Sequence, residues 1–346
     1  MGKLVLSRYS GVSRQAINME DRVKLVVGFI TYGESTAKYL PYFLPSLKTA
    51  LKRFDRFTSG RTACAVLCFD NSEDGEKENM EYIKKNYPEI KIIREGHNLG
   101  FAKAYNKMIK RAGELGAEYF LAINPDTVLA PDAVEKMVKA MDNDKSFGSA
   151  SPKVFKWDFA KNEKTDIIDT LGVKLSPGLR FVDAERGKTD KEARRNEKII
   201  GPSGAAGLYR LSALEKIKQD GQYFDELMFM YKEDCDLAYR LFLAGFKSMR
   251  VDEAVIYHDR SVGAKGEGDL SIAFNRKNKS RQAKKWSFLG QQIIFVKYWS
   301  LQSFKDKLAI VWRQMKILVF ILFFEPYLLR ELVNFAKIQN KIKIYK

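Results

Sequence analysis

The sequence contains few cysteines and histidines and no long hydrophobic run. Three cysteines in 346 residues are too few for a disulfide framework. Cys64 and Cys68 fall on one expected strand, where four residues at roughly 3.3 Å each hold them about 13 Å apart, too far for a bridge. We therefore expect reduced thiols and a cytoplasmic protein.

The hydrophobic segments are too short to cross a bilayer. The longest uncharged apolar run, 317–324, has eight residues and is closed by Glu325 and Pro326, whereas a spanning helix needs roughly 20. Residues 1–21 are polar and contain no apolar core segment, so we expect no signal peptide. We treat residues 1–20 as an N-terminal extension.

Positive charge is in excess, but only in one part of the chain. The formal net charge is +17, and residues 276–346 contain sixteen Lys and Arg against three Asp and Glu, so the first 275 residues are nearly balanced. An apolar content of 45% is enough to bury a substantial core. A basic chain can bind nucleic acid. Here, however, the charge lies among apolar and aromatic residues rather than along a polar face, so we expect no nucleic-acid partner.

The most informative stretch is Tyr-Phe-Leu-Ala-Ile-Asn-Pro-Asp-Thr at 119–127. Its first five residues are apolar or aromatic without alternation, which predicts a strand buried on both faces. Pro125 stops strand pairing, so Asp126 should lie at the carboxyl end of a central strand, where open α/β sheets bind ligands. A carboxylate there suits a divalent metal that carries a phosphate. Alternatively, Asp126 only caps a helix that begins near Pro131.

Further apolar runs at 23–31, 63–69 and 90–94 precede this stretch and alternate with helical patterns. One helix is expected over 101–115, and Ser35 can cap another, so the sequence predicts a mostly parallel α/β sheet flanked by helices. Polar residues follow each strand, and in a parallel sheet these strand ends line one crevice of the kind that binds nucleotides. The alternative for each polar residue is that turns simply require it.

The pattern changes after Met141. Residues 151–155 are one further candidate strand, whereas 156–198 are charged with few periodic apolar positions, and we expect an irregular, partly mobile segment there. Residues 201–207 are rich in glycine and alanine. Such small residues let a backbone approach a ligand or a neighbouring strand closely.

A second group of acids precedes an expected amphipathic helix over 237–244. The helix dipole favours the ionised forms of Glu233 and Asp234 at this end, and the adjacent Phe and Tyr residues would make a partly dry pocket that can tune a base. A plain helix cap is the alternative. His258, one of two histidines, ends an apolar strand and is either a core or turn residue or a metal ligand that the fold brings back to Asp126.

Six motifs occur in a fixed order along the chain: Phe29 to Tyr32, Phe69 to Ser72, Asn98 to Ala102 with Asn106, Asn124 to Thr127, Gly204-Ala205, and Phe224-Asp225 through Glu233-Asp234 to Asp236-Leu237 with Arg240. Together they resemble glycosyltransferase family 2, and in spacing its rhamnosyltransferase-like branch, over residues 23 to about 262. The resemblance implies a GT-A fold, a nucleoside-diphosphate sugar donor, a divalent cation (Mg²⁺ or Mn²⁺) and inversion at the anomeric carbon.

The resemblance also assigns roles by position. Asp234 matches the family's catalytic base, Glu233 would assist or orient it, and Asp126 and His258 would hold the metal. The residues that would bind the nucleotide sugar are Thr31, Tyr32, Glu34, Asp70, Asn98, Gly100, Lys103, Asn124 and Gly204. Asn124 departs from the fuller Asp-x-Asp pattern and is a weaker, neutral ligand, so the donor diphosphate would supply much of the coordination. A single catalytic carboxylate suffices, unlike the paired acids of glycoside hydrolysis.

We therefore expect a GT-A catalytic domain over 21–265, divided into a nucleotide-binding half to 154 and an acceptor half from 155. A basic helical tail over 266–346 would lie in the membrane interface, drawn to anionic lipid on the inner face of the cell membrane. A soluble helical subdomain or an oligomer contact is the alternative for the tail.

The expected function is transfer of rhamnose or another hexose from a UDP or dTDP donor to a glycan or lipid-linked acceptor in cell-surface polysaccharide synthesis. Slow donor hydrolysis in the presence of metal would distinguish it from a non-catalytic nucleotide-sugar-binding scaffold on the same fold.

Overall fold

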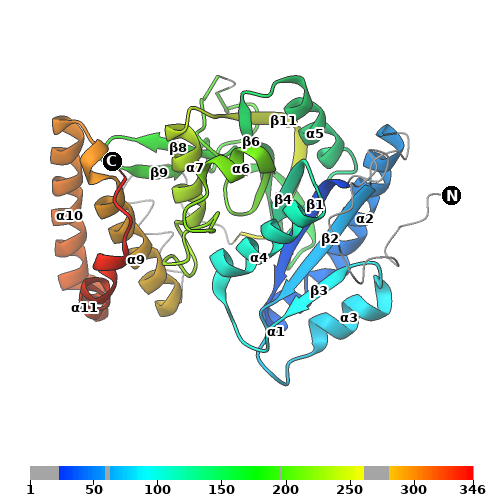
Figure 1. Ribbon diagram of the computed structural model, residues 1–346, viewed down its shortest axis with the longest axis horizontal. Helices are drawn as coiled ribbons and strands as arrows, with labels where there is room; N and C mark the ends of the chain where they lie inside the picture. The colour runs from blue at the N-terminus through cyan, green and yellow to red at the C-terminus, as the bar shows by residue number, and fades with distance from the viewer. Residues whose placement is uncertain (1–22, 59–62, 195, 261–279, 346) are drawn as a thin grey trace.

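The first half of the molecule is a parallel sheet built as predicted. The computed structural model describes residues 23–58, 63–194, 196–260 and 280–345. The sheet's parallel strands are β1 (Val23–Thr31), β2 (Ala63–Asp70), β3 (Lys91–Arg94) and β4 (Tyr119–Ile123). Their spatial order is β3-β2-β1-β4 (Figure 1), and each neighbouring pair is parallel, which confirms the predicted α/β series.

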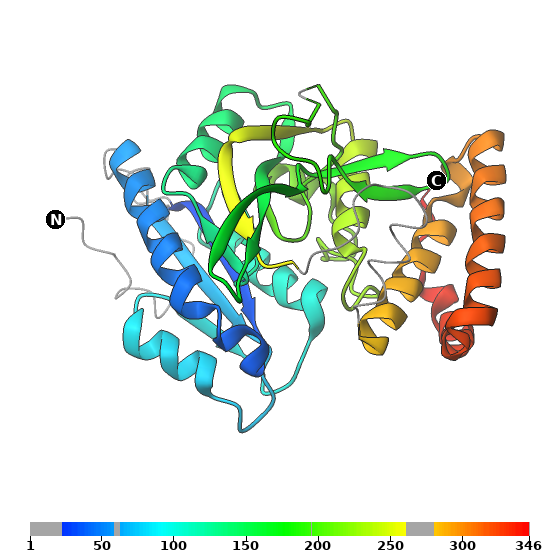
Figure 2. The ribbon, with the colours of Figure 1, turned by 180° about the vertical axis from the view of Figure 1, so that it is seen from behind.

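Helices cover both faces of this sheet, which is why its strands are apolar without alternation. The helices of this part are α1 (Gly33–Ala37), α2 (Leu40–Phe57), α3 (Glu78–Asn86), α4 (Gly100–Glu114), α5 (Ala133–Asn143), α6 (Leu211–Ile217) and α7 (Glu233–Leu243). Val27 of β1 belongs to the core cluster that contains α2 and α5, while its neighbour Val26 belongs to the cluster that contains α4, α6 and α7. Figure 1 shows the second of these faces, and Figure 2 shows α2 on the opposite face.

Two local predictions in this half are wrong. Ser35 does not cap a helix, because α1 begins at Gly33 and the Ser35 hydroxyl lies inside it, donating to the carbonyl of Tyr32. Asp126 does not cap α5 either, because that helix begins at Ala133, after Asp132. The chain instead returns to the sheet directly after Asp126, as the short strand β5 (Thr127–Leu129).

The second half of the sheet is mixed. Its strands are β6 (Phe147–Asp158), β7 (Glu163–Thr170), β10 (Ala206–Arg210) and β11 (Lys247–His258). β10 runs antiparallel between β4 and β6, β11 lies parallel to β6, and β5 pairs antiparallel with β11. Since Thr127 pairs with His258, the sheet itself brings the carboxyl end of β11 beside Asp126.

The prediction of an irregular segment at 156–198 is wrong as far as Asp183, whereas the described residues 184–194 and 196–198 form no helix or strand. β6 continues to Asp158, β7 pairs with it, and β8 (Val173–Ser176) forms a hairpin with β9 (Arg180–Asp183). Many of the charged residues that suggested irregularity are exposed, but Lys156, Asp169 and Glu185 are buried. Ile168, Leu171 and Ala184 form a small core in this segment. Short hairpins with one wet face carry too few apolar positions to give a strong periodic signal.

The C-terminal segment is helical, as expected. It contains α9 (Arg281–Tyr298), α10 (Phe304–Phe324) and α11 (Leu329–Ile338), with 3-10 turns at Trp299–Leu301, Pro326–Leu328 and Gln339–Lys341. α9 packs into a core with α7 and the β8–β9 hairpin through Ile293, Ile294 and Tyr298. The predicted N-terminal extension and the boundary at 265/266 lie outside the described residues.

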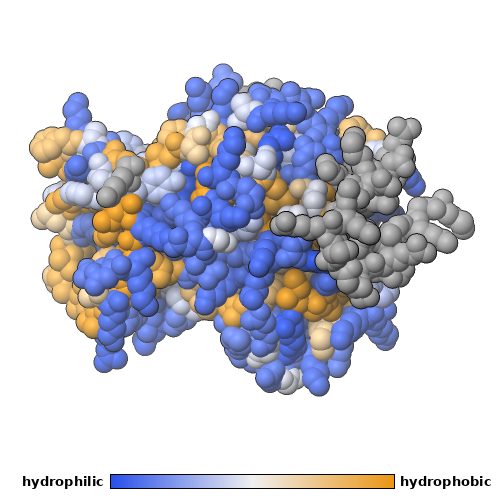
Figure 3. Space-filling model, in the orientation of Figure 1, coloured by the Kyte–Doolittle hydropathy of each residue, from blue (hydrophilic) through white to orange (hydrophobic). Residues whose placement is uncertain are grey.

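α10 carries a broad exposed apolar face. The residues of this face are Phe304, Leu308, Val311, Trp312, Met315, Leu318, Val319, Leu322, Phe323 and Phe324, each at least 46% exposed. Apolar residues gather at the end of the molecule formed by α10 and α11 (Figure 3). In the part of the chain that the structure describes, none of the helices has both the length and the apolarity of a membrane span.

Candidate active site

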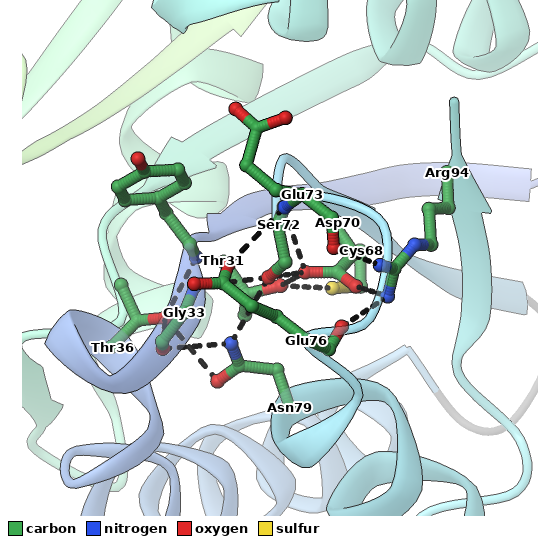
Figure 4. Close-up of polar contacts among 11 residues, drawn as sticks. Thr31, Gly33, Thr36, Cys68, Asp70, Ser72, Glu73, Glu76, Asn79 and Arg94 are labelled. Carbon is green, nitrogen blue, oxygen red and sulfur yellow. Dashed lines mark hydrogen bonds and ion pairs between the residues drawn. The ribbon is translucent and has the colours of Figure 1, made fainter. Parts of the chain in front are cut away.

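The carboxyl ends of β1 and β2 carry two of the residues that were predicted to bind the nucleotide. Thr31 and Asp70 are partners in register and are fully buried. Asp70 Oδ1 accepts hydrogen bonds from Thr31 Oγ1 at 2.9 Å and from Ser72 Oγ at 2.6 Å, and Figure 4 shows these groups converging on the carboxylate. Arg94 Nη1 donates to the other oxygen, Oδ2, at 2.9 Å. The predicted placement of Thr31 and Asp70 at neighbouring strand ends is therefore confirmed, while their contact with a nucleoside stays a prediction.

Arg94 is a residue that the sequence analysis missed. Besides Asp70, its guanidinium donates to the carbonyls of Glu73 at 2.6 Å and Glu76 at 2.7 Å, so one side chain ties the loop after β2 to the strand end. A planar guanidinium with five donors suits this simultaneous bonding. Arg94 ends β3, and its place beside Asp70 follows only once the strand order is known.

The turn after β1 requires a glycine at position 33. Gly33 has φ of 45°, and a Cβ there would lie 3.1 Å from the Glu76 carboxylate. Ser72 Oγ accepts from the Gly33 N–H, and Asn79 Nδ2 donates to its carbonyl, both at 2.9 Å. This bracing leaves Tyr32 and Glu34 exposed at the rim of the turn, where they are free to meet a ligand.

The N-terminus of α4 is fixed in the same way. Asn98 Oδ1 accepts from the N–H of Gly100 at 2.8 Å, and Gly100 has φ of 77°. A Cβ on Gly100 would meet the carbonyl of Phe229 at 2.5 Å, so only glycine allows the loop before α7 to approach this closely. Lys103 lies one turn further along α4 and is exposed. Asn98 thus acts within the turn, and its predicted contact with the nucleotide stays a prediction.

Asp126 and His258 come together as the metal hypothesis requires. His258 Nε2 lies 3.3 Å from Asp126 Oδ2, and the other ring nitrogen, Nδ1, lies 2.9 Å from Asp169 Oδ2. Burial would lower the pKa of His258, but Asp126 and then Asp169 outweigh it and raise that pKa to about 10. Asp169 is buried, yet Arg260 and His258 hold its pKa below the usual range.

This geometry fits a divalent cation. Asp126 Oδ1 is a buried acceptor without a hydrogen-bond partner in the described residues, which is an open ligand position. An imidazole that binds metal usually gives its other N–H to a carboxylate, and Asp169 is placed to receive it from His258. Within the described ranges, His, Cys, Asp and Glu side chains form no group of three or more that could hold a metal ion. A metal at Asp126 and His258 would also need oxygens from a bound diphosphate. The presence of Asn124, where the Asp-x-Asp pattern has a carboxylate, led to the same expectation.

Asp234 faces the small-residue segment between β9 and β10. Its Oδ2 accepts from the N–H of Gly204 at 3.0 Å, and its Oδ1 accepts from the N–H of Cys235 at 2.8 Å. The next residue along, Ala205, accepts through its carbonyl from the Asn124 N–H at 2.9 Å. Gly204 and Ala205 therefore connect the carboxylate at the start of α7 with the end of β4 that carries Asn124 and Asp126.

Glu233 differs from its neighbour in being enclosed. Its side chain is 3% exposed, and Oε2 has no hydrogen-bond partner among the described residues. Burial, followed by the adjacent Asp234 carboxylate, raises the pKa of Glu233 well above its ordinary value. This shift opposes the ionised form of Glu233 that the helix dipole was expected to favour, and it suits an orienting role better than that of the base.

The backbone before α7 is strained. Tyr231 and Lys232 have φ of 69° and 78°, a conformation that residues other than glycine adopt at a cost of roughly 1 to 3 kcal/mol each. The close approach of Phe229 to Gly100 and of Tyr231 to Gly290 on α9 holds this loop in place. Such strain persists only where the surroundings enforce it, and here it sets the entry of Glu233 and Asp234 into the helix.

Contacts link several of the predicted residues. Asp126 approaches His258, and the Asn124 N–H donates to the carbonyl of Ala205, whose neighbour Gly204 donates to Asp234. Asp169 and Arg260 were both missed from the sequence. Asp169 lay in the segment taken for irregular, and its only possible signal was a carboxylate next to the end of a short apolar run, Ile167-Ile168.

Comparison with known proteins shows which family and fold the chain resembles. A model of the family described as Glycosyl transferase family 2 matches residues 27–218. The N-acetylglucosaminyl-diphospho-decaprenol L-rhamnosyltransferase of Mycobacterium tuberculosis is 27% identical over 252 residues, which cover 68% of this chain and 76% of that protein, in both strains compared.

Two solved structures are similar at the level of the fold. The crystal structure of GalNAc-T7 with UDP, GalNAc and Mn²⁺ has a TM-score of 0.50 at 14% identity, over 79% of this chain and 51% of that one, so this chain spans about half of its length. A mannosyltransferase from Pyrobaculum calidifontis in complex with GDP-Man and Mn²⁺ has a TM-score of 0.49 at 15% identity, over 94% and 78% of the two chains. The expected GT-A fold is confirmed.

Proposed function

The chain belongs to glycosyltransferase family 2, and on this premise we propose that it transfers rhamnose or another hexose from a nucleoside-diphosphate donor to a hydroxyl group of a glycan or lipid-linked acceptor. The observation that carries the proposal is the approach of His258 to Asp126 at 3.3 Å from distant parts of the sequence. The M. tuberculosis relative is named for rhamnosyl transfer to N-acetylglucosaminyl-diphospho-decaprenol, which supports cell-surface polysaccharide synthesis as the setting.

Asp234 is the proposed base. A sugar hydroxyl is a poor nucleophile until its proton has a destination, and a carboxylate within hydrogen-bond reach provides one as attack begins. The N–H groups of Gly204 and Cys235 fix this carboxylate, so it needs no reorganisation before accepting the proton. Attack from the side opposite the departing diphosphate inverts the anomeric carbon.

Asp126 and His258 are the proposed ligands of a divalent cation, and Asp169 orients the imidazole. When bound, such a cation stabilises the negative charge of the departing diphosphate as a Lewis acid. Thr31, Tyr32, Glu34, Asp70, Asn98, Gly100, Lys103, Asn124 and Gly204 would surround the donor. Thr31 and Asp70, being buried, would shape the pocket floor beneath a UDP or dTDP nucleoside.

We place the enzyme on a membrane surface. The exposed apolar face of α10, in a segment with excess Lys and Arg, has the composition of a helix lying in the interface of an anionic leaflet. A peripheral position on the cytoplasmic side would bring the site to a lipid-linked acceptor.

A thermal-shift panel tests the proposal. The full chain is heated with UDP and dTDP sugars, each with Mn²⁺ or with EDTA, alongside Asp126→Asn and Asp166→Asn variants. Asp166 is an exposed acid outside the site and serves as the matched control. One donor should raise the melting temperature only with Mn²⁺, and Asp126→Asn should lose that effect while Asp166→Asn keeps it. A chain that no nucleotide sugar stabilises would contradict the proposal.

A further inference from the structure

Two arginines lie beside the candidate metal ligands, and the chemistry proposed above does not use them. We propose that Arg186 and Arg260 form a phosphate-binding subsite for the lipid-linked acceptor. The inference rests on the proposed function, because it assumes that the acceptor carries a phosphate next to the sugar that is extended.

Arg260 connects the subsite to the metal ligands. Its Nη1 lies 3.3 Å from Asp169 Oδ1 and 3.1 Å from Asp183 Oδ2, and Asp169 in turn bonds His258. Toward the described residues Arg260 donates through this one nitrogen, and its side chain is 33% exposed. The remaining N–H groups of a guanidinium fork are suited to bidentate contact with a phosphate.

Arg186 is a poorly satisfied cation. Its closest carboxylate oxygen among the described residues is Asp183 Oδ2 at 3.7 Å, the same oxygen that Arg260 approaches more closely. The side chain is 17% exposed, and its Nε atom is buried and has no hydrogen-bond acceptor among the described residues. Burial and the neighbouring Arg260 lower the pKa of Arg186. A buried donor without an acceptor is costly, and an anion between the two guanidinium groups would remove that cost.

The backbone holds Arg186 in place before any ligand arrives. The Ala184 N–H donates to the Gly172 carbonyl, and the Gly187 N–H donates to the Ile168 carbonyl, both at 2.8 Å. These bonds pin the turn that carries Arg186 against the end of β7, next to Asp169. The turn that carries Arg186 is therefore fixed by backbone hydrogen bonds on both sides of this residue.

The subsite lies on the side of the proposed base. Phe181 of β9 packs against Tyr239 of α7 with ring centroids 5.8 Å apart, and both share a core with Cys235. Asp183, two residues after Phe181, therefore ends β9 beside α7, together with the two arginines that approach it. The nucleoside floor at Thr31 and Asp70 is on β1 and β2, in the other part of the sheet. We therefore assign the two arginines, which lie close to α7, to the acceptor phosphate and not to the donor nucleoside.

The β8–β9 hairpin connects this subsite with α10, through the side of that helix opposite its exposed apolar face. Arg313 of α10 donates to the Leu179 carbonyl at 3.2 Å, a Cβ on Gly178 would lie 3.2 Å from Ala309, and Phe181 shares a core with Ile310. The tip of the hairpin therefore lies against the helix that we assign to the membrane surface, and its other end, at Asp183, lies beside the two arginines. A lipid-linked acceptor presents an apolar chain, then a phosphate and then a sugar hydroxyl.

A binding measurement without turnover tests the subsite. Farnesyl diphosphate and farnesol are titrated by calorimetry into the full chain in EDTA, so that no metal bridges the diphosphate. The wild type should prefer the diphosphate, and Arg186→Gln should weaken its binding by about 10- to 100-fold without affecting farnesol. Arg186→Lys should recover part of the loss as a point charge. Lys191→Gln removes a positive charge from an exposed site in the same segment and should change nothing.

Three results would overturn the proposal. Arg186→Gln could keep the wild-type preference while its melting temperature is normal, or Lys191→Gln could lose as much affinity as Arg186→Gln. Competition by saturating UDP in EDTA would assign the arginines to the donor diphosphate.

A steady-state measurement separates the two substrates. Arg186→Gln should raise KM for a diphosphate-linked acceptor and leave KM for the donor unchanged. It should also leave transfer to an uncharged alkyl glycoside of the same sugar unchanged, and a rise in the donor KM instead would overturn the acceptor assignment. Absence of transfer from any donor by the wild type would refute the proposed function, while the binding preference in EDTA would still report on the arginines.

Discussion

Lys297 provides the strongest test of how the C-terminal helices relate to the catalytic fold. Its side chain is fully buried at the end of α9, with Nζ 2.6 Å from Asp225 Oδ2 and 2.8 Å from Asp236 Oδ1. Asp236 belongs to α7, where it also bonds Arg240 at 2.8 Å and the Tyr298 hydroxyl at 2.6 Å. One lysine therefore links the C-terminal segment to the helix that carries the proposed base.

We expect Lys297→Met to destabilise the protein strongly. Removing one partner of a buried ion pair costs about 3 to 5 kcal/mol, and because Arg240 still neutralises Asp236, we take the lower end, about 3 kcal/mol. For a chain of this size, whose unfolding entropy is about 2.1 cal/mol/K per residue, that corresponds to a fall in melting temperature of roughly 4 °C. Turnover should fall as well, since α7 loses a support close to Asp234.

Calorimetric unfolding and a donor-turnover assay measure both effects. Lys337→Met makes the same substitution at an exposed position on α11 and should leave both values near those of the wild type. The Asp236→Asn/Lys297→Met double variant should lose less stability than the sum of the two single variants, because the two side chains interact directly. A Lys297→Met protein that melts with the wild type would refute the reasoning, and the segment would then be a detachable appendage.

Three further predictions concern the metal, acid stability and the membrane. Asp169→Asn should weaken Mn²⁺ binding in the presence of nucleotide about 10- to 100-fold by calorimetry, since it disturbs the orientation of His258, and unchanged affinity would remove Asp169 from that role. Although burial opposes it, Lys297 and Arg240 lower the pKa of Asp236 to about 2, below its unfolded value. The ionised Asp236 therefore contributes about 2 kcal/mol to the unfolding free energy above pH 4, and this contribution is lost as the pH falls toward 2. The unfolding free energies of the wild type and Asp236→Asn should converge over that range, and a constant difference would contradict this. Replacing exposed Leu322 and Phe323 by Asp should abolish sedimentation with anionic vesicles while leaving donor binding intact, and full retention on vesicles would count against the α10 face.

The sequence predicted best where burial on both faces leaves a strong pattern. β4 appeared as an unbroken apolar run because helices cover both sides of it, and its boundary placed Asp126 correctly at a strand end. The approach of His258 could be stated only as a condition, because it depends on β5 pairing with β11. That pairing requires the chain to return to the sheet directly after Asp126, as a strand of three residues. Local sequence propensity does not predict so short a strand.

Prediction from the sequence was least successful where charged residues are buried in ordered structure. The segment 156–198 was taken for irregular, yet it supplies Asp169 and Arg186, whose partners come from the end of β11 and from β9. Lys297 lay in a run taken for membrane-facing and proved to be buried. The sequence shows that a lysine or aspartate is present, but only the fold shows that it is buried next to a residue of opposite charge.

The most direct test of the central claim, that Asp234 is the base of a glycosyl transfer at this site, uses the Asp234→Asn variant. Donor affinity by calorimetry with Mn²⁺ and turnover by release of nucleoside diphosphate are measured on the same protein. The account predicts nearly normal donor affinity and a loss of turnover of about 10²- to 10⁴-fold. Turnover within a few-fold of the wild type would contradict it.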